Sequence, residues 1–231
     1  MLLTLEIRDV LPATPRARIV RISLDGAAFD YAAGQAVLVG VPDGPKRPYS
    51  VATSPGETRR AGCLELLVGV DENGRAGPHL PLQRGRVVDV DGPLGSFTFP
   101  PTPAERRFVF IAGGTGIAPL RAMLHHALAI PHEQIGLLYS ARTPDEFAYE
   151  GEFRALAQEG RIELRQTVTR TVGEGWLGAR GRIGRAELQA LVHDPATLCF
   201  ICGPPALVLE MTTHLAELGI ERSRIRVEEW G

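Results

Sequence analysis

The sequence has little of what several common classes of protein need. It holds 3 cysteines in 231 residues, too few for a disulfide framework, which agrees with a reducing compartment. Its 25 Lys and Arg are mixed with 27 Asp and Glu, so the basic surface of a nucleic-acid-binding protein is missing. We therefore expect no nucleic-acid partner.

Long hydrophobic runs are missing as well. The longest uncharged stretches, 108–120 and 197–209, contain glycine and proline and are shorter than the ~20 residues of a membrane-spanning helix. Glu6 and Arg8 interrupt the N-terminal apolar segment, so no signal peptide is predicted. These observations predict a soluble, cytoplasmic protein that does not bind a membrane.

Proline marks a division of the chain. Twelve of the 18 prolines lie before residue 104, and Pro100-Pro101-Thr102-Pro103 is the best linker because consecutive prolines continue neither a strand ladder nor a helix. A chain of this length can form two ordinary domains, each with its own core. We predict one domain over 1–101 and a second over 102–231.

Short segments rich in Val, Ile and Leu fill the first part, separated by clusters of Gly, Pro, Asp and Asn. Such spacing is typical of an antiparallel barrel, and we expect a Greek-key barrel here. The predicted strands are 17–24, 35–41, 47–53, 63–70 and 86–91.

After the linker, strand-like and helix-like segments alternate. The predicted strands are 107–112, 135–140, 162–168, 198–202 and 224–228, and the predicted helices are 117–129, 145–158, 185–192 and 204–218. This alternation predicts a Rossmann-like parallel α/β domain with helices on both faces of the sheet. Ligands of such sheets bind at the carboxyl ends of the strands.

A glycine-rich turn, Gly113-Gly114-Thr115-Gly116, joins the first of these strands to a helix. A turn of this kind presents backbone N–H groups at a helix N-terminus, where a phosphate or pyrophosphate can bind. The alternative is an ordinary turn whose glycines only allow close packing.

Arg47-Pro48-Tyr49-Ser50 combines a bidentate anion donor, an aromatic ring and a hydroxyl in one predicted strand. Alternation places Arg47 and Tyr49 on one face and Ser50 on the other. A phosphate contact could therefore lie beside a stacking surface. The alternative is a surface arginine next to a half-buried tyrosine.

Four motifs occur in the order and approximate spacing of the ferredoxin–NADP reductase superfamily, which the chain resembles over almost its whole length. They are Arg47-Pro48-Tyr49-Ser50, Gly113-Gly114-Thr115-Gly116-Ile117-Ala118-Pro119, Cys202-Gly203-Pro204-Pro205 and Glu228-Glu229-Trp230-Gly231. The resemblance implies a flavin-binding barrel followed by a nicotinamide-nucleotide domain. It also implies that hydride passes between the two rings.

In the first domain the resemblance gives roles to one strand. Arg47 resembles the ligand of the flavin phosphate, Tyr49 the ring that stacks on the isoalloxazine, and Ser50 the hydroxyl near the flavin nitrogen that accepts hydride. Pro48 stands between them in the same motif.

The second flavin motif of the family, a glycine followed by Ser or Thr, is altered in this chain. The corresponding stretch, Gly74-Arg75-Ala76-Gly77-Pro78-His79-Leu80, has no hydroxyl. Backbone N–H groups of Gly77 or Leu80 could hold a phosphate instead. FAD is the predicted flavin, and FMN stays open.

In the second domain, Gly114, Thr115 and Gly116 resemble the pyrophosphate turn of the family. Cys202 resembles the thiol beside the nicotinamide, and Gly203 and Pro204 shape the turn beneath it. The alternative for Cys202 is a redox or metal site shared with Cys199, although residues three apart on a strand face opposite sides.

The choice of nicotinamide nucleotide depends on side chains expected at strand ends, namely Arg142, Thr169, Arg170 and Arg182. In members that use NADPH, a hydroxyl and an arginine at the Thr169-Arg170 position hold the 2′-phosphate. NADPH is therefore favoured over NADH. The alternative is that these arginines form solvated ion pairs.

Near the C-terminus, Trp230 resembles the aromatic residue that covers the flavin and must move before nicotinamide can stack. Glu228 resembles a carboxylate that relays protons to or from the reduced flavin. Fraying of the chain end would remove both roles.

The resemblance predicts an NAD(P)H-dependent flavin oxidoreductase that serves a ferredoxin, a flavodoxin or an oxygenase component. Four thiolates would be needed for a [2Fe–2S] cluster, so an iron–sulfur carrier would be a separate protein. Two alternatives remain: a reductase of free flavin or of another small acceptor, and an accessory electron-transfer subunit of a larger complex.

Overall fold

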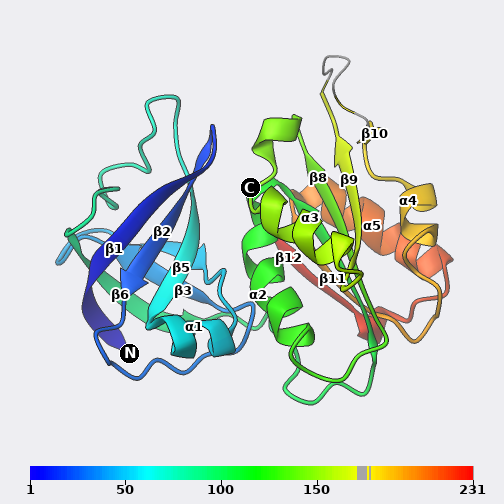
Figure 1. Cartoon of the computed structure of the whole chain (residues 1–231), viewed down its shortest axis with the longest axis horizontal. Coiled ribbons are helices and arrows are strands. Elements are labelled where there is room, and N and C mark those ends of the chain that lie inside the picture. Colours follow the sequence, from blue (N-terminus) through cyan, green and yellow to red (C-terminus); the bar gives the residue numbers. More distant parts are fainter. Residues whose placement is uncertain (171–175, 177, 231) are drawn as a thin grey trace. The chain divides into compact units, whose positions relative to one another are not determined.

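The computed structural model describes residues 1–170, 176 and 178–230. The chain divides into two compact units (Figure 1). The first contains Met1–Pro101 together with Arg121–His126, and the second contains Thr102–Leu120 and Ala127–Gly231. Gly231, the last residue of the terminal motif, lies outside the described residues.

The sheet of the first unit is antiparallel, and its strand order is β4-β3-β6-β1-β2-β5. A bridge between Val51 and Leu66 and a hydrogen bond of 2.8 Å from the Ala52 N–H to the Glu65 carbonyl join the two outer strands. The predicted antiparallel Greek-key barrel is thereby confirmed. Its strands are β1 (Leu2–Thr14), β2 (Ala17–Ser23), β3 (Ala36–Gly40), β4 (Arg47–Ser50), β5 (Cys63–Gly69) and β6 (Val87–Leu94).

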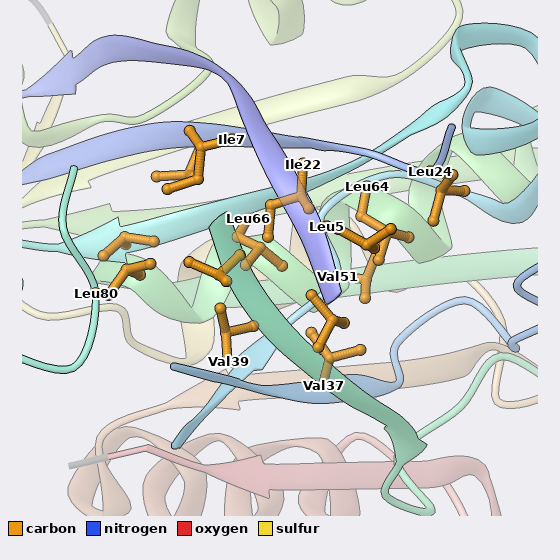
Figure 2. Packing of buried hydrophobic residues seen from close by; sticks show 14 of the residues in the cluster. Leu5, Ile7, Ile22, Leu24, Val37, Val39, Val51, Leu64, Leu66 and Leu80 are labelled. Atoms are coloured by element: carbon orange, nitrogen blue, oxygen red, sulfur yellow. The ribbon is translucent and has the colours of Figure 1, made fainter. Parts of the chain in front are cut away.

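Aliphatic side chains fill this barrel. Figure 2 shows Ile7, Ile22 and Leu66 among the residues of the buried cluster. Each such side chain contributes about 1.5–3 kcal/mol when fully buried. Leu80 belongs to the same cluster although it lies in the loop before β6, so the core fixes one end of that loop.

Two elements of the first unit were not predicted from the sequence. β1 contains Glu6 and Arg8, which were interpreted only as interruptions of an apolar segment, yet its Leu5 and Ile7 alternate inward as in any half-buried strand. The short helix α1 (Pro55–Ala61) begins with a capping box of Ser54 and Glu57. It lies next to predicted strand 47–53, whose regular part ends at Ser50.

The sheet of the second unit is parallel, in the order β10-β9-β8-β7-β11-β12. Its strands are β7 (Arg107–Gly113), β8 (Gln134–Ala141), β9 (Glu163–Val168), β10 (Ala179–Arg180), β11 (Leu198–Gly203) and β12 (Ile225–Glu229). The helices are α2 (Ile117–Ala127), α3 (Glu150–Gln158), α4 (Arg185–Gln189) and α5 (Pro205–Glu217), with short 3-10 turns η1 (Gly114–Gly116), η2 (Pro144–Glu146) and η3 (Arg222–Arg224). The predicted Rossmann-like domain is confirmed.

Strand order reverses next to β7, which lies between β8 and β11. In open parallel sheets this reversal creates the crevice in which ligands bind. One face of the sheet buries Val109 and Ile111 with residues of α4 and α5, while on the other Phe110 stacks on Phe200 with ring centroids 5.4 Å apart. Among the described residues no helix is long and apolar enough to cross a membrane.

Candidate functional site

Three glycines bring the carboxyl ends of β7 and β11 together. A Cβ atom on Gly116 would lie 2.3 Å from the carbonyl oxygen of Cys202, and one on Gly113 would lie 2.7 Å from the Leu207 side chain. A Cβ on Gly203 would meet the Gly113 backbone at 3.1 Å. The packing function considered for these glycines is therefore present at positions 113, 116 and 203.

Gly114 and Thr115 are different, because both are exposed between these packed positions. Gly114 has φ of +55°, and a Cβ there would meet nothing within 4 Å. The pair leads through η1 into α2, and the first N–H groups of a helix have no partner within the helix. The turn thus combines a close-packed base with an open backbone surface suited to an anion.

Tyr139, on β8, supports the turn over 113–116 through a hydrogen bond to its backbone. Its hydroxyl donates to the Gly114 carbonyl at 3.1 Å and accepts from the Ala148 N–H at 3.2 Å. The ring is fully buried and meets Phe147 edge-on at 5.0 Å. Complete burial raises the pKa of the Tyr139 phenol, so the hydroxyl stays a donor. Sequence reasoning missed this residue, and its one signal was a tyrosine near the carboxyl end of a strand.

The residues predicted to select NADPH or NADH lie just after the carboxyl ends of β8, β9 and β10. The Thr169 N–H donates to the Ala141 carbonyl at 3.0 Å, and the Arg170 N–H donates to the Arg142 carbonyl at 2.9 Å. The ends of β8 and β9 therefore stay paired beyond the strands themselves.

Arg182 follows β10, which pairs in parallel with β9. Arg142, Arg170 and Arg182 are exposed. Within the described residues their side chains make no hydrogen bond or ion pair. Guanidinium groups of this kind can bind a phosphate through two parallel hydrogen bonds.

Cys202, Glu228 and Trp230 form a cluster at the carboxyl ends of β11 and β12. Cys202 is the register partner of Glu228, and its Sγ lies 4.0 Å from Glu228 Oε2. The Trp230 indole N–H donates to the same oxygen at 2.8 Å, while the Trp230 backbone N–H donates to the Gly203 carbonyl at 3.0 Å. Trp230 is therefore held at two points.

The charges of this cluster follow from its burial. Desolvation raises the pKa of the Glu228 carboxyl, and the hydrogen bond from Trp230 lowers it in part. Burial first, and then the Glu228 charge, raise the pKa of the Cys202 thiol. Cys202 therefore stays a neutral thiol at neutral pH, suited to packing against an uncharged ring. Pro204 follows at the start of α5 and shapes the turn after β11.

All three cysteines are free and buried. Cys199 belongs to the apolar cluster under α5, where burial raises its pKa to about 12, whereas Cys202 contacts Glu228. In the described part of the chain no group of three or more His, Cys, Asp or Glu is placed to hold a metal ion.

In the first unit, the predicted flavin residues lie on β4, and their burial increases along the strand from Arg47 to Ser50. Arg47 and Pro48 are exposed, Tyr49 is half-buried against the barrel core, and Ser50 is buried. Among the described residues the Arg47 side chain makes no ion pair or hydrogen bond. A free cation beside a planar ring fits a flavin phosphate and isoalloxazine.

His79, in the loop before β6, is hydrogen-bonded to Tyr49 of β4. A 2.6 Å hydrogen bond joins its Nε2 to the Tyr49 hydroxyl oxygen, and the two rings are nearly parallel, 10° apart. His79 is 2% exposed and lies one residue after Pro78 in the turn from Gly77 to Leu80. The sequence alone predicts no role for this histidine.

Comparison with known proteins defines the class. The oxidoreductase FAD-binding domain family matches residues 6–99, and the oxidoreductase NAD-binding domain family matches residues 110–213. The chain is an FAD- and NAD(P)-binding oxidoreductase.

Its relatives narrow this class. Ferredoxin–NADP reductase B of Sorangium cellulosum is 35% identical over 96% of this chain and 94% of its own length. The carnitine monooxygenase reductase subunit of Escherichia coli is 28% identical over 97% of this chain and 67% of its own length. The crystal structure of the Amycolatopsis cytochrome P450 reductase GcoB superposes with a TM-score of 0.83 at 27% identity, covering 99% of this chain and 70% of that one. The chain belongs to the ferredoxin–NADP reductase family, whose members pass electrons from NAD(P)H through a flavin to a carrier.

Proposed function

We propose that this protein oxidises NADPH and delivers the electrons to a separate iron–sulfur carrier of the ferredoxin type. The observation that carries the choice of NADPH is a set of three guanidinium groups at the ends of β8 to β10, those of Arg142, Arg170 and Arg182, which are exposed and have no partner in the part of the chain that the structure describes. The choice of carrier is supported by the ferredoxin–NADP reductase of Sorangium cellulosum. The sequence has only 3 cysteines, fewer than the four thiolates of a [2Fe–2S] cluster.

We assign residues 1–101 as the flavin-binding domain and residues 102–231 as the NAD(P)-binding domain. In the first, Arg47 binds the flavin phosphate, Pro48 and Tyr49 border the ring system, and Ser50 supplies a hydroxyl near the reacting edge. The turn from Gly77 to Leu80 faces the phosphate. Bound flavin supplies the redox chemistry, since it accepts two electrons together and releases them singly.

In the second domain, Gly114 and Thr115 bind the pyrophosphate on the open surface of the turn, above the packed Gly113 and Gly116. Thr169 and the three arginines hold the 2′-phosphate. Cys202 borders the nicotinamide on the base formed by Gly203 and Pro204.

We also assign roles to Glu228 and Trp230 of the second domain. Trp230 would cover the ring of a bound flavin, and Glu228 would exchange protons with that ring. We place the protein in the cytoplasm, in keeping with its few, free cysteines.

An oxygenase component is the second candidate acceptor. It is supported by the relatives named as a monooxygenase reductase subunit and a cytochrome P450 reductase. The two candidate acceptors can be distinguished by mixing the purified protein with NADPH and ferredoxin. Reduction of the ferredoxin in the absence of an oxygenase component supports ferredoxin as the acceptor.

The purified protein tests the proposal directly. We expect a yellow protein with a flavin absorption band at about 450 nm, which NADPH bleaches faster than NADH does in stopped-flow measurements. A protein that stays colourless after addition of FAD or FMN contradicts the assignment of the flavin residues. Faster bleaching by NADH contradicts the assignment of the arginines, and Trp230→Ala with the parent rate for both donors contradicts the covering role of Trp230.

A further inference from the structure

The turn formed by Gly77, Pro78, His79 and Leu80 is held rigidly beside β4. The Leu80 N–H donates to the Gly77 carbonyl at 3.3 Å, and the Val41 N–H donates to the His79 carbonyl at 2.9 Å. Leu80 is anchored in the barrel core. Because the Leu80 N–H already closes the turn, it is a poor donor to any outside ligand.

The two ring nitrogens of His79 have different surroundings. Nε2 bonds the Tyr49 hydroxyl at 2.6 Å, whereas Nδ1 has no hydrogen-bond partner among the described residues. A Cβ atom on Gly77 would lie 3.2 Å from Nδ1, so Nδ1 lies directly beside this exposed glycine. When Nε2 accepts the hydrogen bond from Tyr49, the neutral imidazole carries its proton on Nδ1, so this nitrogen can donate to a ligand that accepts a hydrogen bond.

The charges nearby indicate which ligand that is. Burial first, and then the Arg47 charge, lower the pKa of His79. Burial raises the pKa of Tyr49. At neutral pH the imidazole is therefore neutral with one N–H, and the phenol keeps its proton. Arg47 supplies a positive charge beside them, which favours an anion over a neutral ligand.

We propose that the Nδ1–H of His79 donates a hydrogen bond to the phosphate of the bound flavin nucleotide, while Nε2 accepts one from the Tyr49 hydroxyl. The imidazole thereby links the phosphate to the ring that stacks on the flavin, and it replaces the hydroxyl side chain that this turn lacks. This inference rests on the proposed flavin site of the first domain. It assigns His79 as a further binding residue for the phosphate that FAD and FMN share.

Two substitutions of His79 distinguish the roles of its two ring nitrogens. Asn places an amide group near the position of Nδ1, and Gln places one near the position of Nε2. We would measure the dissociation constants of FAD, FMN and riboflavin with the full-length apoprotein, from quenching of flavin fluorescence. We expect His79→Gln to weaken FAD and FMN about tenfold, the effect of one charge-assisted hydrogen bond. Riboflavin, which has no phosphate, should bind as it does to the parent. His79→Asn should keep FAD affinity within about threefold of the parent.

Other outcomes overturn the inference. An equal loss for riboflavin would mean a structural role, and no loss in His79→Gln, or an equal loss in His79→Asn, would remove the Nδ1 assignment. If either variant is unfolded at the temperature of the titration, the parent protein is measured by NMR with 15N-labelled histidine and bound FMN. A scalar coupling between Nδ1 and phosphorus supports the hydrogen bond, and the absence of this coupling rules it out. A parent that binds no flavin at all contradicts the proposed function itself.

Discussion

The indole N–H of Trp230 donates to Oε2 of Glu228 at 2.8 Å, and the thiol of Cys202 approaches the same oxygen at 4.0 Å. A single carboxylate oxygen thus contacts the proposed lid and the residue proposed to border the nicotinamide. Displacement of Trp230 would remove the donor that lowers the pKa of Glu228, so the lid and the proton affinity of the carboxylate are linked.

Trp230→Phe tests this link. Loss of the N–H donor should raise the pKa of Glu228 further, because the hydrogen bond from Trp230 favours the charged form of the carboxylate. The carboxyl stretching band of protonated Glu228, followed by infrared spectroscopy against pH, measures the midpoint. Glu228→Gln identifies the band by removing it, and an unchanged midpoint in Trp230→Phe would show that the hydrogen bond does not persist in solution.

Gly114→Ala and Gly116→Ala should separate binding from packing. At position 116 a Cβ would lie 2.3 Å from the Cys202 carbonyl, so we expect a loss of about 2–3 kcal/mol in the free energy of unfolding. At position 114 the space is open but φ is +55°, which costs about 1 kcal/mol. Its main effect should be a higher KM for NADPH, because the methyl group stands where the pyrophosphate is proposed. Denaturant unfolding and steady-state kinetics measure the two effects.

Arg142→Ala and Arg170→Ala should each raise the KM for NADPH by about tenfold and leave the KM for NADH within about twofold, because only NADPH carries the 2′-phosphate. Arg154→Ala is the matched control, since Arg154 is exposed but paired with Glu150 at 2.7 Å. Equal changes for both nucleotides would place the arginines elsewhere than at the 2′-phosphate.

Tyr139→Phe removes the hydroxyl that supports the Gly114 carbonyl. We expect it to destabilise the protein by about 1–2 kcal/mol and to raise the KM for NADPH and for NADH alike. Tyr31→Phe provides the comparison: Tyr31 donates to the Thr53 carbonyl at 2.7 Å in the first unit, so it should lower stability without changing either KM. A variant at position 139 with the parent KM values would show that the turn needs no support from below.

The sequence allowed most strands and helices to be predicted because their periodicities differ between the two units. The turn predicted over 113–116 follows β7 in the structure. The difference between the packed Gly113 and Gly116 and the open Gly114 was not predicted, because the approach of Cys202 and Leu207 depends on how β7 and β11 pack. Nothing in the local sequence distinguishes Gly114 from its neighbours.

His79 and Tyr139 could not be found for a related reason. Each acts through a hydrogen bond to a residue distant in the chain, Tyr49 and Gly114 respectively. Sequence reasoning gave neither a role, because such a contact shows only when the strands are paired. β1 was missed since its charged residues alternate outward, which a search for apolar runs overlooks.

The bridge between Val51 and Leu66 also affects how the first unit meets other molecules. A sheet whose outer strands pair with each other presents few free backbone groups to a strand of another chain. Self-association of this unit by strand addition is therefore disfavoured, even though Val87 and Leu94 on β6 are exposed. We expect the barrel not to form fibrils by strand addition as long as the bridge between Val51 and Leu66 is intact.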